Sequence, residues 1–285
     1  MSRPQHLTGI DHCVILVNDL DAASATYKRL GFTLSPRGTH SEHMGSANYT
    51  IMLGEDYFEL LGIINPTERN QRWRDVLKRG EGLNAIALQT DDAEKACAEI
   101  RGMGIEANDP VHFSRPVNMP GGGTGEAAFI VTQFPADATP STQMFVCGHL
   151  TRDTVWIPEL QQHANTAKAL AAVTVATEQP EADAEAYGRI FGAEAVGAID
   201  GGAAVQTGGT PIEFLTPAAL AGRYPGVPLG DIRLSAPFGL SFQVADLGTA
   251  KAALEAAGTK AVDVSGNVCV APADACGTLL EFRAG

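Results

Sequence analysis

The chain has 285 residues, of which 45% are hydrophobic and 19% charged, and its formal net charge is −13. This length predicts two domains or one large pseudo-symmetric domain. The acidic balance argues against nucleic acid and against anionic membranes as partners, although a local arginine could still hold an anionic substrate. No run of about 18 apolar residues predicts a membrane span, and the first residues lack the apolar core of a signal peptide.

The number and spacing of the cysteines indicate the cellular compartment. There are five of them, an odd and scattered set that does not suggest a disulfide framework. A reducing cytoplasm is therefore the expected location. The set consists of Cys13, Cys97, Cys147, Cys269 and Cys276.

The first predicted elements form a short unit at the N-terminus. An apolar strand over residues 10–18 ends at Asp19, a helix follows over 21–30, and Gly31 comes directly after it. Aspartate caps helix N-termini and glycine takes the left-handed conformation that ends a helix. Three β-like runs follow, over 32–37, 48–53 and 57–63.

The same order of elements returns three times along the chain. The later helices end before Gly104, Gly192 and Gly258, and Pro180 opens the third one. The second unit has strands at 83–90, 111–115, 127–134 and 144–150. The third has them at 171–177, 195–199, 203–207 and 212–215, and the fourth at 238–246, 261–265, 267–271 and 279–283.

Such regular spacing predicts an α+β protein of four βαβββ modules. Modules 1 and 2 would occupy residues 1–150, a linker 151–169, and modules 3 and 4 residues 170–285.

The first module carries a family resemblance. The sequence Ile10-Asp11-His12, the Gly31-Phe32 pair and the run 57–61 around Glu59 resemble the vicinal oxygen chelate superfamily of glyoxalases, bleomycin-resistance proteins and extradiol dioxygenases. The chain is most similar to its glyoxalase-like domain proteins. This resemblance implies that modules pair into two cup-shaped half-barrel sheets, and that first and fourth strands of paired modules hold a divalent metal.

The resemblance also implies a ligand set in the N-terminal half. His12 and Glu59 stand at the first-strand and fourth-strand positions, and imidazole and carboxylate both suit Zn, Ni, Mn or Fe. Glu59 could instead serve as a general base. A metal centre needs a third ligand, and His149 is the preferred candidate, ahead of three others: Asn84, His40 and His43. His149 could alternatively hold the linker.

The C-terminal half lacks such a set. Its first-strand positions are read as Leu170 and Gly239, so Glu213 and Glu281 have no imidazole partner. We expect this half to be structural.

Three further side chains are substrate-binding candidates. Asn48 and Thr50 alternate along one strand and so face the same side, while Arg115 could bind a substrate carboxylate through its bidentate fork. A surface ion pair is the alternative for Arg115. Cys13 and Cys147 lie on strands and are read as buried small apolar residues.

Two functional hypotheses remain open. In the first, a metal-dependent lyase, isomerase or dioxygenase acts on a small oxygenated substrate. In the second, the cup is a non-catalytic, drug-sequestering module like the bleomycin-resistance proteins. Both predict a small-molecule partner and neither nucleic acid nor membrane, in a monomer or a homodimer.

Overall fold

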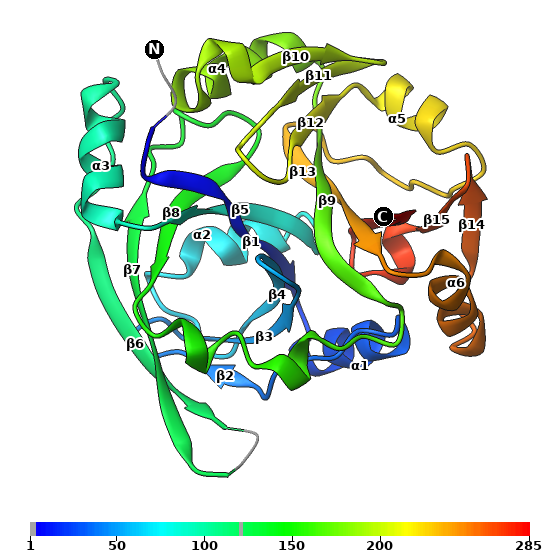
Figure 1. Cartoon of the computed structure of the whole chain (residues 1–285), viewed down its shortest axis with the longest axis horizontal. Helices are drawn as coiled ribbons and strands as arrows, with labels where there is room; N and C mark the ends of the chain where they lie inside the picture. Colours follow the sequence, from blue (N-terminus) through cyan, green and yellow to red (C-terminus); the bar gives the residue numbers. More distant parts are fainter. Residues whose placement is uncertain (1–3, 120–121) are drawn as a thin grey trace.

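The computed structural model describes residues 4–119 and 122–285, which form two eight-stranded sheets. Each sheet is built from two βαβββ modules, so the predicted α+β architecture of four modules paired into two cups is confirmed. Figure 1 shows the N-terminal sheet in blue to green, curled into a ring, beside the C-terminal sheet, whose colours run from the green of β9 to red.

The N-terminal sheet contains modules 1 and 2. Module 1 consists of β1 (Leu7–Val17), α1 (Leu20–Arg29), β2 (Gly38–Thr39), β3 (Ser46–Met52) and β4 (Tyr57–Ile63). A helix that the sequence pattern did not predict, α2 (Gln71–Leu77), leads to module 2. Module 2 consists of β5 (Gly82–Thr90), α3 (Ala93–Gly102), β6 (Val111–Asn118), β7 (Thr124–Gln133) and β8 (Gln143–His149).

The C-terminal sheet follows after two 3₁₀ turns, η1 (Arg152–Thr154) and η2 (Pro158–Gln161). Module 3 consists of β9 (Ala167–Ala176), α4 (Pro180–Phe191), the short turn η3 (Ala193–Ala195), β10 (Val196–Ile199), β11 (Gly202–Val205) and β12 (Ile212–Leu215). A second unpredicted helix, α5 (Pro217–Arg223), precedes module 4. Module 4 consists of β13 (Ala236–Val244), α6 (Leu247–Ala256), β14 (Ala261–Val264), β15 (Asn267–Val270), the turn η4 (Pro272–Asp274) and β16 (Leu279–Ala284).

The two sheets have the same topology. Their strand orders are β2-β3-β4-β1-β5-β8-β7-β6 and β10-β11-β12-β9-β13-β16-β15-β14. In both, the first strands of the two modules pair antiparallel at the centre, and each first strand pairs parallel with the fourth strand of its own module.

The predicted helix boundaries have the expected chemistry. The Asp19 carboxylate accepts hydrogen bonds from the backbone N–H groups of Asp21 and Ala22, which have no partner inside the helix. Gly31 and Gly104 end α1 and α3 with φ values of +84° and +82°. A side chain with a Cβ would be strained there, which is why glycine marks both ends.

All four first strands carry a β-bulge at the same place. The pairing of β1 with β5 skips Asp11 and Asn84, and the pairing of β9 with β13 skips Ala171 and Phe238. A bulge inserts one residue that has no partner opposite it. Two consecutive side chains can therefore face the cup, the bulged residue and the one after it.

This register corrects two positions read from the sequence. The residue that follows each bulge, and so corresponds to His12, is Ala85 in β5, Ala172 in β9 and Gly239 in β13. Asn84 corresponds to Asp11, and Leu170 lies in the hydrophobic core behind the sheet. A one-residue bulge reverses the face of every side chain beyond it, and nothing in the residue pattern reveals it.

One hydrophobic core joins the two halves. It packs the outer faces of both sheets around α1, α3, α4 and α6. Phe32 and Phe58 of the N-terminal half lie 5.3 Å from the Phe242 ring of the C-terminal half, measured between ring centroids. The Tyr27 hydroxyl also donates to the carbonyl oxygen of Ala275 across the junction.

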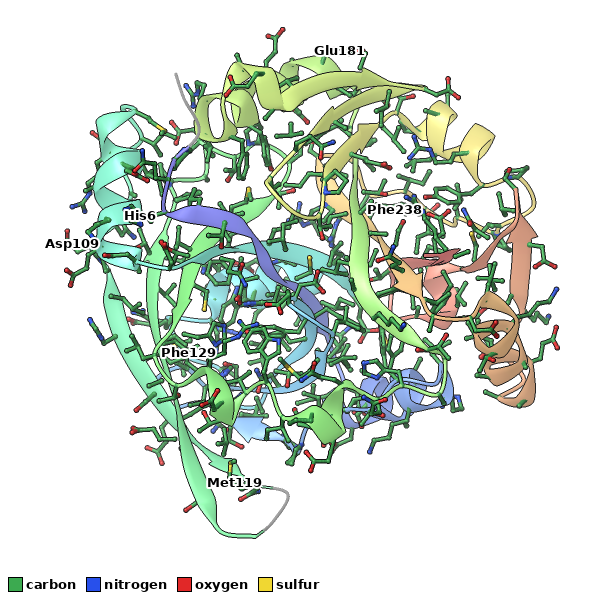
Figure 2. All side chains as sticks on the ribbon, viewed as in Figure 1. His6, Asp109, Met119, Phe129, Glu181 and Phe238 are labelled. Carbon is green, nitrogen blue, oxygen red and sulfur yellow. The ribbon has the colours of Figure 1, made fainter. Side chains whose placement is uncertain are left out.

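The two cups are filled separately from this core. Side chains of α2 and of the segment after β8, including Val155 and Trp156, pack into the N-terminal cup, where Figure 2 labels Phe129. In the C-terminal cup, Leu220 of α5 and the following Tyr224 occupy the equivalent space. Within the described residues, no helix combines the length and apolarity needed to cross a membrane.

Candidate functional site

The buried carboxylate of Asp11 is the centre of a polar cluster in the N-terminal cup. Its Oδ2 accepts a hydrogen bond from Nδ1 of His12 at 2.6 Å and another from Nε2 of His149 at 3.0 Å. His149 is the last residue of β8, and the bulge at Asp11 turns the carboxylate towards it. The Asp11 side chain is fully buried.

The charge of Asp11 follows from these contacts. Burial alone raises the pKa of a carboxyl group, but the hydrogen bonds from His12 and His149 outweigh burial, and the pKa lies below the ordinary value. Asp11 is therefore ionised at neutral pH. Its second oxygen, Oδ1, is buried and has no hydrogen bond among the described residues, and the same is true of His149 Nδ1.

Cys147 completes a group of metal-ligand type. Its Sγ lies 4.0 Å from His149 Nε2, and ligand atoms of Asp11, Cys147 and His149 all lie within 4.8 Å of one another. Carboxylate, thiolate and imidazole together suit Zn²⁺ or a similar divalent transition metal. The unpartnered Asp11 Oδ1 is consistent with a cation, because an ionised buried oxygen without a partner is costly. The residues present therefore fit a metal.

Sequence reasoning missed two members of this group. Strand alternation predicts that Asp11 points to the face opposite His12. A cysteine on a strand is usually a small buried apolar residue, so Cys147 was not predicted as a ligand either. Two signals were available. Cys147 and His149 are two residues apart on one strand and so share a face, and Asp11 is adjacent to His12.

The same three residues do not form a nucleophilic triad. In a Cys-His-Asp triad the carboxylate binds one ring nitrogen and the thiol binds the other. Here both Asp11 and Cys147 approach Nε2 of His149. Burial also raises the pKa of the Cys147 thiol well above its ordinary value, with further increases from Asp11 and Glu59. A thiol with a raised pKa is a poor nucleophile.

His12 is held rigidly within the cup. Its ring stacks on Tyr57 with centroids 4.4 Å apart and meets Phe145 edge-on at 5.5 Å. With Nδ1 bonded to Asp11, the other nitrogen, Nε2, has no hydrogen bond to a described residue. It is thus available as a base or a ligand.

Glu59 faces the same cup from β4 but has a different partner. Its Oε2 accepts a hydrogen bond from Asn48 Nδ2 at 2.5 Å, and the residue is 9% exposed. The structure thus joins His12 to His149 through Asp11, and Glu59 to Asn48. Within the described chain, His12, Glu59 and His149 do not form a ligand group of the kind that Asp11, Cys147 and His149 form. The predicted ligand set stays a prediction.

The other candidate third ligands lie apart from this group. The Nδ1 of His40 bonds to Ser46 Oγ at 2.7 Å, and burial lowers the pKa of His40. His43 is exposed in the loop before β3.

Aromatic rings and the segment after β8 enclose His149. Its ring centroid lies 4.8 Å from that of Trp156 and 5.0 Å from that of Phe129. Trp156 is fixed by a hydrogen bond from Nε1 to the carbonyl oxygen of Gly54, and the Arg152 guanidinium lies 3.6 Å above its ring. This segment covers the cup at the level of His149 and limits the access of water.

The predicted substrate-binding residues lie at the mouth of the same cup. Thr50 and Arg115 line a small cavity, and Asn48 is two residues before Thr50 on the same face of β3. Edge strands β2 and β6 approach each other here, and the Arg115 guanidinium of β6 lies against Gly38 of β2. Arg115 is not part of a surface ion pair with any described residue.

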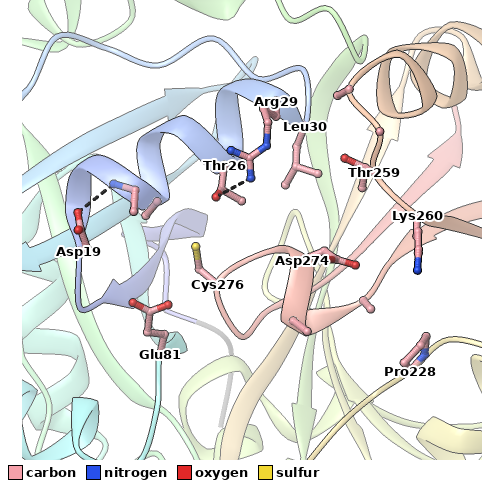
Figure 3. Close-up of a pocket in the computed structure, with 16 residues that line it drawn as sticks. Asp19, Thr26, Arg29, Leu30, Glu81, Pro228, Thr259, Lys260, Asp274 and Cys276 are labelled. Atoms are coloured by element: carbon pink, nitrogen blue, oxygen red, sulfur yellow. Dashed lines mark hydrogen bonds between the residues drawn. The ribbon is translucent and has the colours of Figure 1, made fainter.

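A larger groove of about 660 Å³ lies between the two halves (Figure 3). Arg29 of α1 lies on one wall and Lys260 after α6 on the other, together with acidic residues such as Glu81 and Asp274. Burial raises the pKa of the Cys276 thiol there to about 12. The groove contains none of the cup residues, and its mixed charges select no ligand class, so the cup is the better candidate site.

Comparisons with known proteins agree with this architecture. The family model described as glyoxalase-like domain matches residues 10–191. No curated protein matches the chain. A hypothetical protein from Staphylococcus aureus is 12% identical with a TM-score of 0.67, and the match covers 97% of this chain and 99% of that one.

Two further solved structures share the fold. A triple mutant of 4-hydroxymandelate synthase from Streptomyces coelicolor is 13% identical with a TM-score of 0.64, covering 98% of this chain and 93% of that one. A fusion protein of a xylose isomerase-like TIM barrel and 4-hydroxyphenylpyruvate dioxygenase is 14% identical with a TM-score of 0.59, covering 99% of this chain and 50% of that one. At such identities the likeness concerns the fold.

Proposed function

Because the chain belongs to the glyoxalase-like domain family, we propose that its N-terminal cup is the active site of a divalent-metal-dependent enzyme. The substrate is a small oxygenated molecule, and the reaction is an isomerase- or lyase-type proton transfer. Dioxygenase chemistry, the other metal-dependent reaction, would use two histidines and one carboxylate, as in the set of His12, His149 and Glu59. The protein acts in the cytoplasm, as a monomer or a homodimer.

One observation carries the metal assignment. Asp11, Cys147 and His149 bring three different ligand atoms within 4.8 Å of one another in a buried place, and Asp11 Oδ1 has no partner there among the described residues. Three protein ligands leave a coordination position for substrate. A metal at these residues would act as a Lewis acid that stabilises negative charge on a substrate oxygen.

The proton transfer is assigned to Glu59. Its Oε2 is held by Asn48, whereas Oε1 has no hydrogen bond to a described residue and can accept a proton from substrate. His12 is the second candidate proton carrier. Its Nδ1 is fixed by Asp11, so a proton would be exchanged at Nε2. The rings of Trp156 and Phe129 exclude water around this chemistry.

The alternative is a non-catalytic module that sequesters a small molecule. The aromatic enclosure of His149 and the segment that covers the cup favour it, because they suit retention of a ligand as well as its conversion. Metal content separates the two functions.

The test is metal analysis by mass spectrometry on protein purified without a histidine tag and loaded with Zn²⁺, Ni²⁺, Mn²⁺ or Fe²⁺. Wild type should retain near-stoichiometric metal, and Asp11→Asn and Cys147→Ser should lose it. Cys97→Ser is the matched control, because Cys97 is a buried cysteine of α3 remote from the cup, bonded to the Asn108 carbonyl oxygen. Wild type without metal would exclude the enzyme hypothesis.

Glu59→Gln distinguishes the two ligand sets. If Asp11, Cys147 and His149 hold the metal, this variant keeps its metal and loses turnover. Loss of metal in Glu59→Gln, with retention in Cys147→Ser, would instead support the set of His12, Glu59 and His149.

A further inference from the structure

Two unpartnered donors face one small cavity at the mouth of the N-terminal cup. The cavity has a volume of about 30 Å³ and is lined by Thr50, Arg115 and the segments around them. Thr50 is 5% exposed, and its hydroxyl has no hydrogen bond to a described residue. The Arg115 guanidinium also has neither a hydrogen bond nor an ion pair there. Arg115 is only partly buried, so both donors are open to the cavity and available to an acceptor that enters it.

The charge around this cavity is positive, although the protein carries a net charge of −13. Arg37 and Arg115 both line it, and no carboxylate does. The ion pair of Arg37 with Asp21 is long, 3.4 Å, and both side chains are substantially exposed, so it neutralises little of this charge. The two guanidinium groups therefore favour an anion as the acceptor that enters this cavity.

Arg115 is positioned for such an anion by its neighbours. A Cβ added to Gly38 would lie 2.7 Å from Arg115 Nη1 and 2.4 Å from Asn48 Oδ1, so the guanidinium packs closely over glycine and beside that amide oxygen. Asn48 Oδ1 is buried and has no hydrogen bond among the described residues. Arg115 also lines the cavity, so its guanidinium lies between this amide region and the open space.

The size of the cavity limits what enters. A single water needs roughly 10–15 Å³ by the same kind of measure, so about 30 Å³ admits one carboxylate group and not a whole substrate. The remaining walls are mixed, with Val117, Ile157 and Leu160 among the apolar residues and Asn118 and Thr154 among the polar ones. A guanidinium and a carboxylate form charge-assisted hydrogen bonds, which are stronger than those between neutral groups.

We propose that Arg115 and Thr50 form a carboxylate subsite, and that the molecule bound in the N-terminal cup is an organic acid. The claim that this acid is a substrate rests on the proposed function. The claim that it binds at Arg115 does not, and the two can fail separately.

The test measures binding of isocaproate and of its uncharged isostere isocaproamide by ligand-observed NMR titration. Wild type should bind the acid at least about tenfold more tightly than the amide, because hydrogen bonds to a charged group are the stronger ones. Arg115→Gln should weaken isocaproate binding by about tenfold or more and Thr50→Val by about threefold. Absence of saturable isocaproate binding, or equal affinities for acid and amide, would overturn the proposal.

Two further variants guard against loss of folding as an explanation. Gly38→Ala keeps every charge but displaces the guanidinium, so it should also weaken binding. Arg101→Gln is the matched control, because Arg101 lies on α3 and pairs with exposed Asp109. Its affinity for isocaproate should equal that of wild type. An effect of Arg101→Gln as large as that of Arg115→Gln would show only a general charge effect and would contradict the subsite.

Two further measurements complete the experiment: isocaproate binding to metal-stripped protein, and competition by inorganic phosphate. Isocaproate binding that survives metal removal and depends on Arg115 supports the subsite, even if the enzyme hypothesis fails. Binding that is lost with the metal and unaffected by Arg115→Gln would place the carboxylate at the metal, which overturns the subsite and leaves the proposed function intact. Phosphate that displaces isocaproate at lower concentration than acetate does would exclude carboxylate selectivity.

Discussion

The two cups share a topology but differ in whether their buried acids are satisfied. In the C-terminal cup, Glu281 accepts hydrogen bonds from Ser241 at 2.7 Å, Asn267 at 2.8 Å and Arg283 at 2.7 Å, and a longer one from Tyr224. Burial raises its pKa, but these donors outweigh burial and leave it lowered. In the N-terminal cup, Asp11 Oδ1 and Asn48 Oδ1 have no such partners among the described residues.

The difference is one between an acid that the fold itself satisfies and buried atoms that the fold leaves without a partner among the described residues. A carboxylate with a full set of donors is complete without a ligand, as Glu281 is, whereas unsatisfied buried atoms cost stability and are retained where a ligand completes them. Glu213, the other fourth-strand acid of the C-terminal half, is likewise paired, with Arg223. We therefore still expect a structural role for the C-terminal half.

The largest expected effect on stability comes from Asp56, which lies at the junction between the two halves. Asp56, after β3, accepts hydrogen bonds from the backbone N–H of Leu170 in β9, and burial raises its pKa from 3.8 to about 7. An acid with a raised pKa holds its proton longer in the folded protein. It thus adds stability that is full below about pH 4 and is lost as pH rises towards 7.

Asp56 should change the free energy of unfolding by at most about 4 kcal/mol across this pH range. This magnitude follows from the difference between its pKa of about 7 in the folded protein and the ordinary value of 3.8. Urea unfolding of wild type and Asp56→Asn between pH 4 and 8 measures it. The free-energy difference between the two proteins should change with pH in this window. Parallel pH profiles would mean that Asp56 titrates normally and that the junction is not desolvated.

The next effect compares the acids of the two cups directly. Glu281→Ala leaves Arg283 without its buried partner and should lower the free energy of unfolding by about 3 kcal/mol. Glu59→Ala removes one hydrogen bond to Asn48 and should cost about 1 kcal/mol in metal-free protein. Chemical denaturation of both variants measures the two losses. Equal losses would break the distinction between a structural and a functional cup.

Metal should stabilise through the N-terminal cup alone. At a free metal concentration 100 times the dissociation constant, binding adds about 2.7 kcal/mol to wild type. Thermal melting with and without a chelator should show this difference in wild type and in Glu281→Gln, and lose it in Asp11→Asn. A chelator effect that persists in Asp11→Asn would place the metal elsewhere.

The smallest effect concerns the cover of the N-terminal cup. Arg152 lies over Trp156 and pairs with the exposed Glu55, so Arg152→Ala should cost about 1 kcal/mol or less. Trp fluorescence should nonetheless report greater mobility of the ring. Glu55→Ala is the control for the ion pair alone. An equal fluorescence change in that control would assign the effect to the ion pair.

Much of the fold could be predicted from the sequence because its signals are local. Each module repeats an apolar strand, a helix start such as Asp19 and a helix-ending glycine such as Gly31. Helices α2 and α5 were not predicted, because they lie between modules and have no counterpart signal. The bulges were not predicted either, since they depend on the pairing of distant strands.

The sequence predicted the candidate site less precisely than it predicted the fold. The cup and its side chains His12 and Glu59 follow from the family resemblance, whereas strand alternation predicts that Asn48 and Thr50 share a face. The pairing within the cup does not, because the Asp11 contact with His149 joins residues 138 positions apart. Strand alternation would place Asp11 on the opposite face, and only the bulge reverses this.

The bulges also make this scaffold suited to redesign. Positions Ala172 and Gly239 correspond to His12, and the acids Glu213 and Glu281 pair in the parallel register with Thr174 and Ser241, two residues further along the same strands. Histidines at these two positions would give the C-terminal cup a two-imidazole, two-carboxylate set. Ala172 offers an ordinary Cβ, whereas a Cβ at Gly239 would lie 3.2 Å from Leu279 and need a small local shift. Two substitutions would thus repeat the His12 and Glu59 positions of the N-terminal cup in a half of the protein where Arg223 and Arg283 already pair with the two acids.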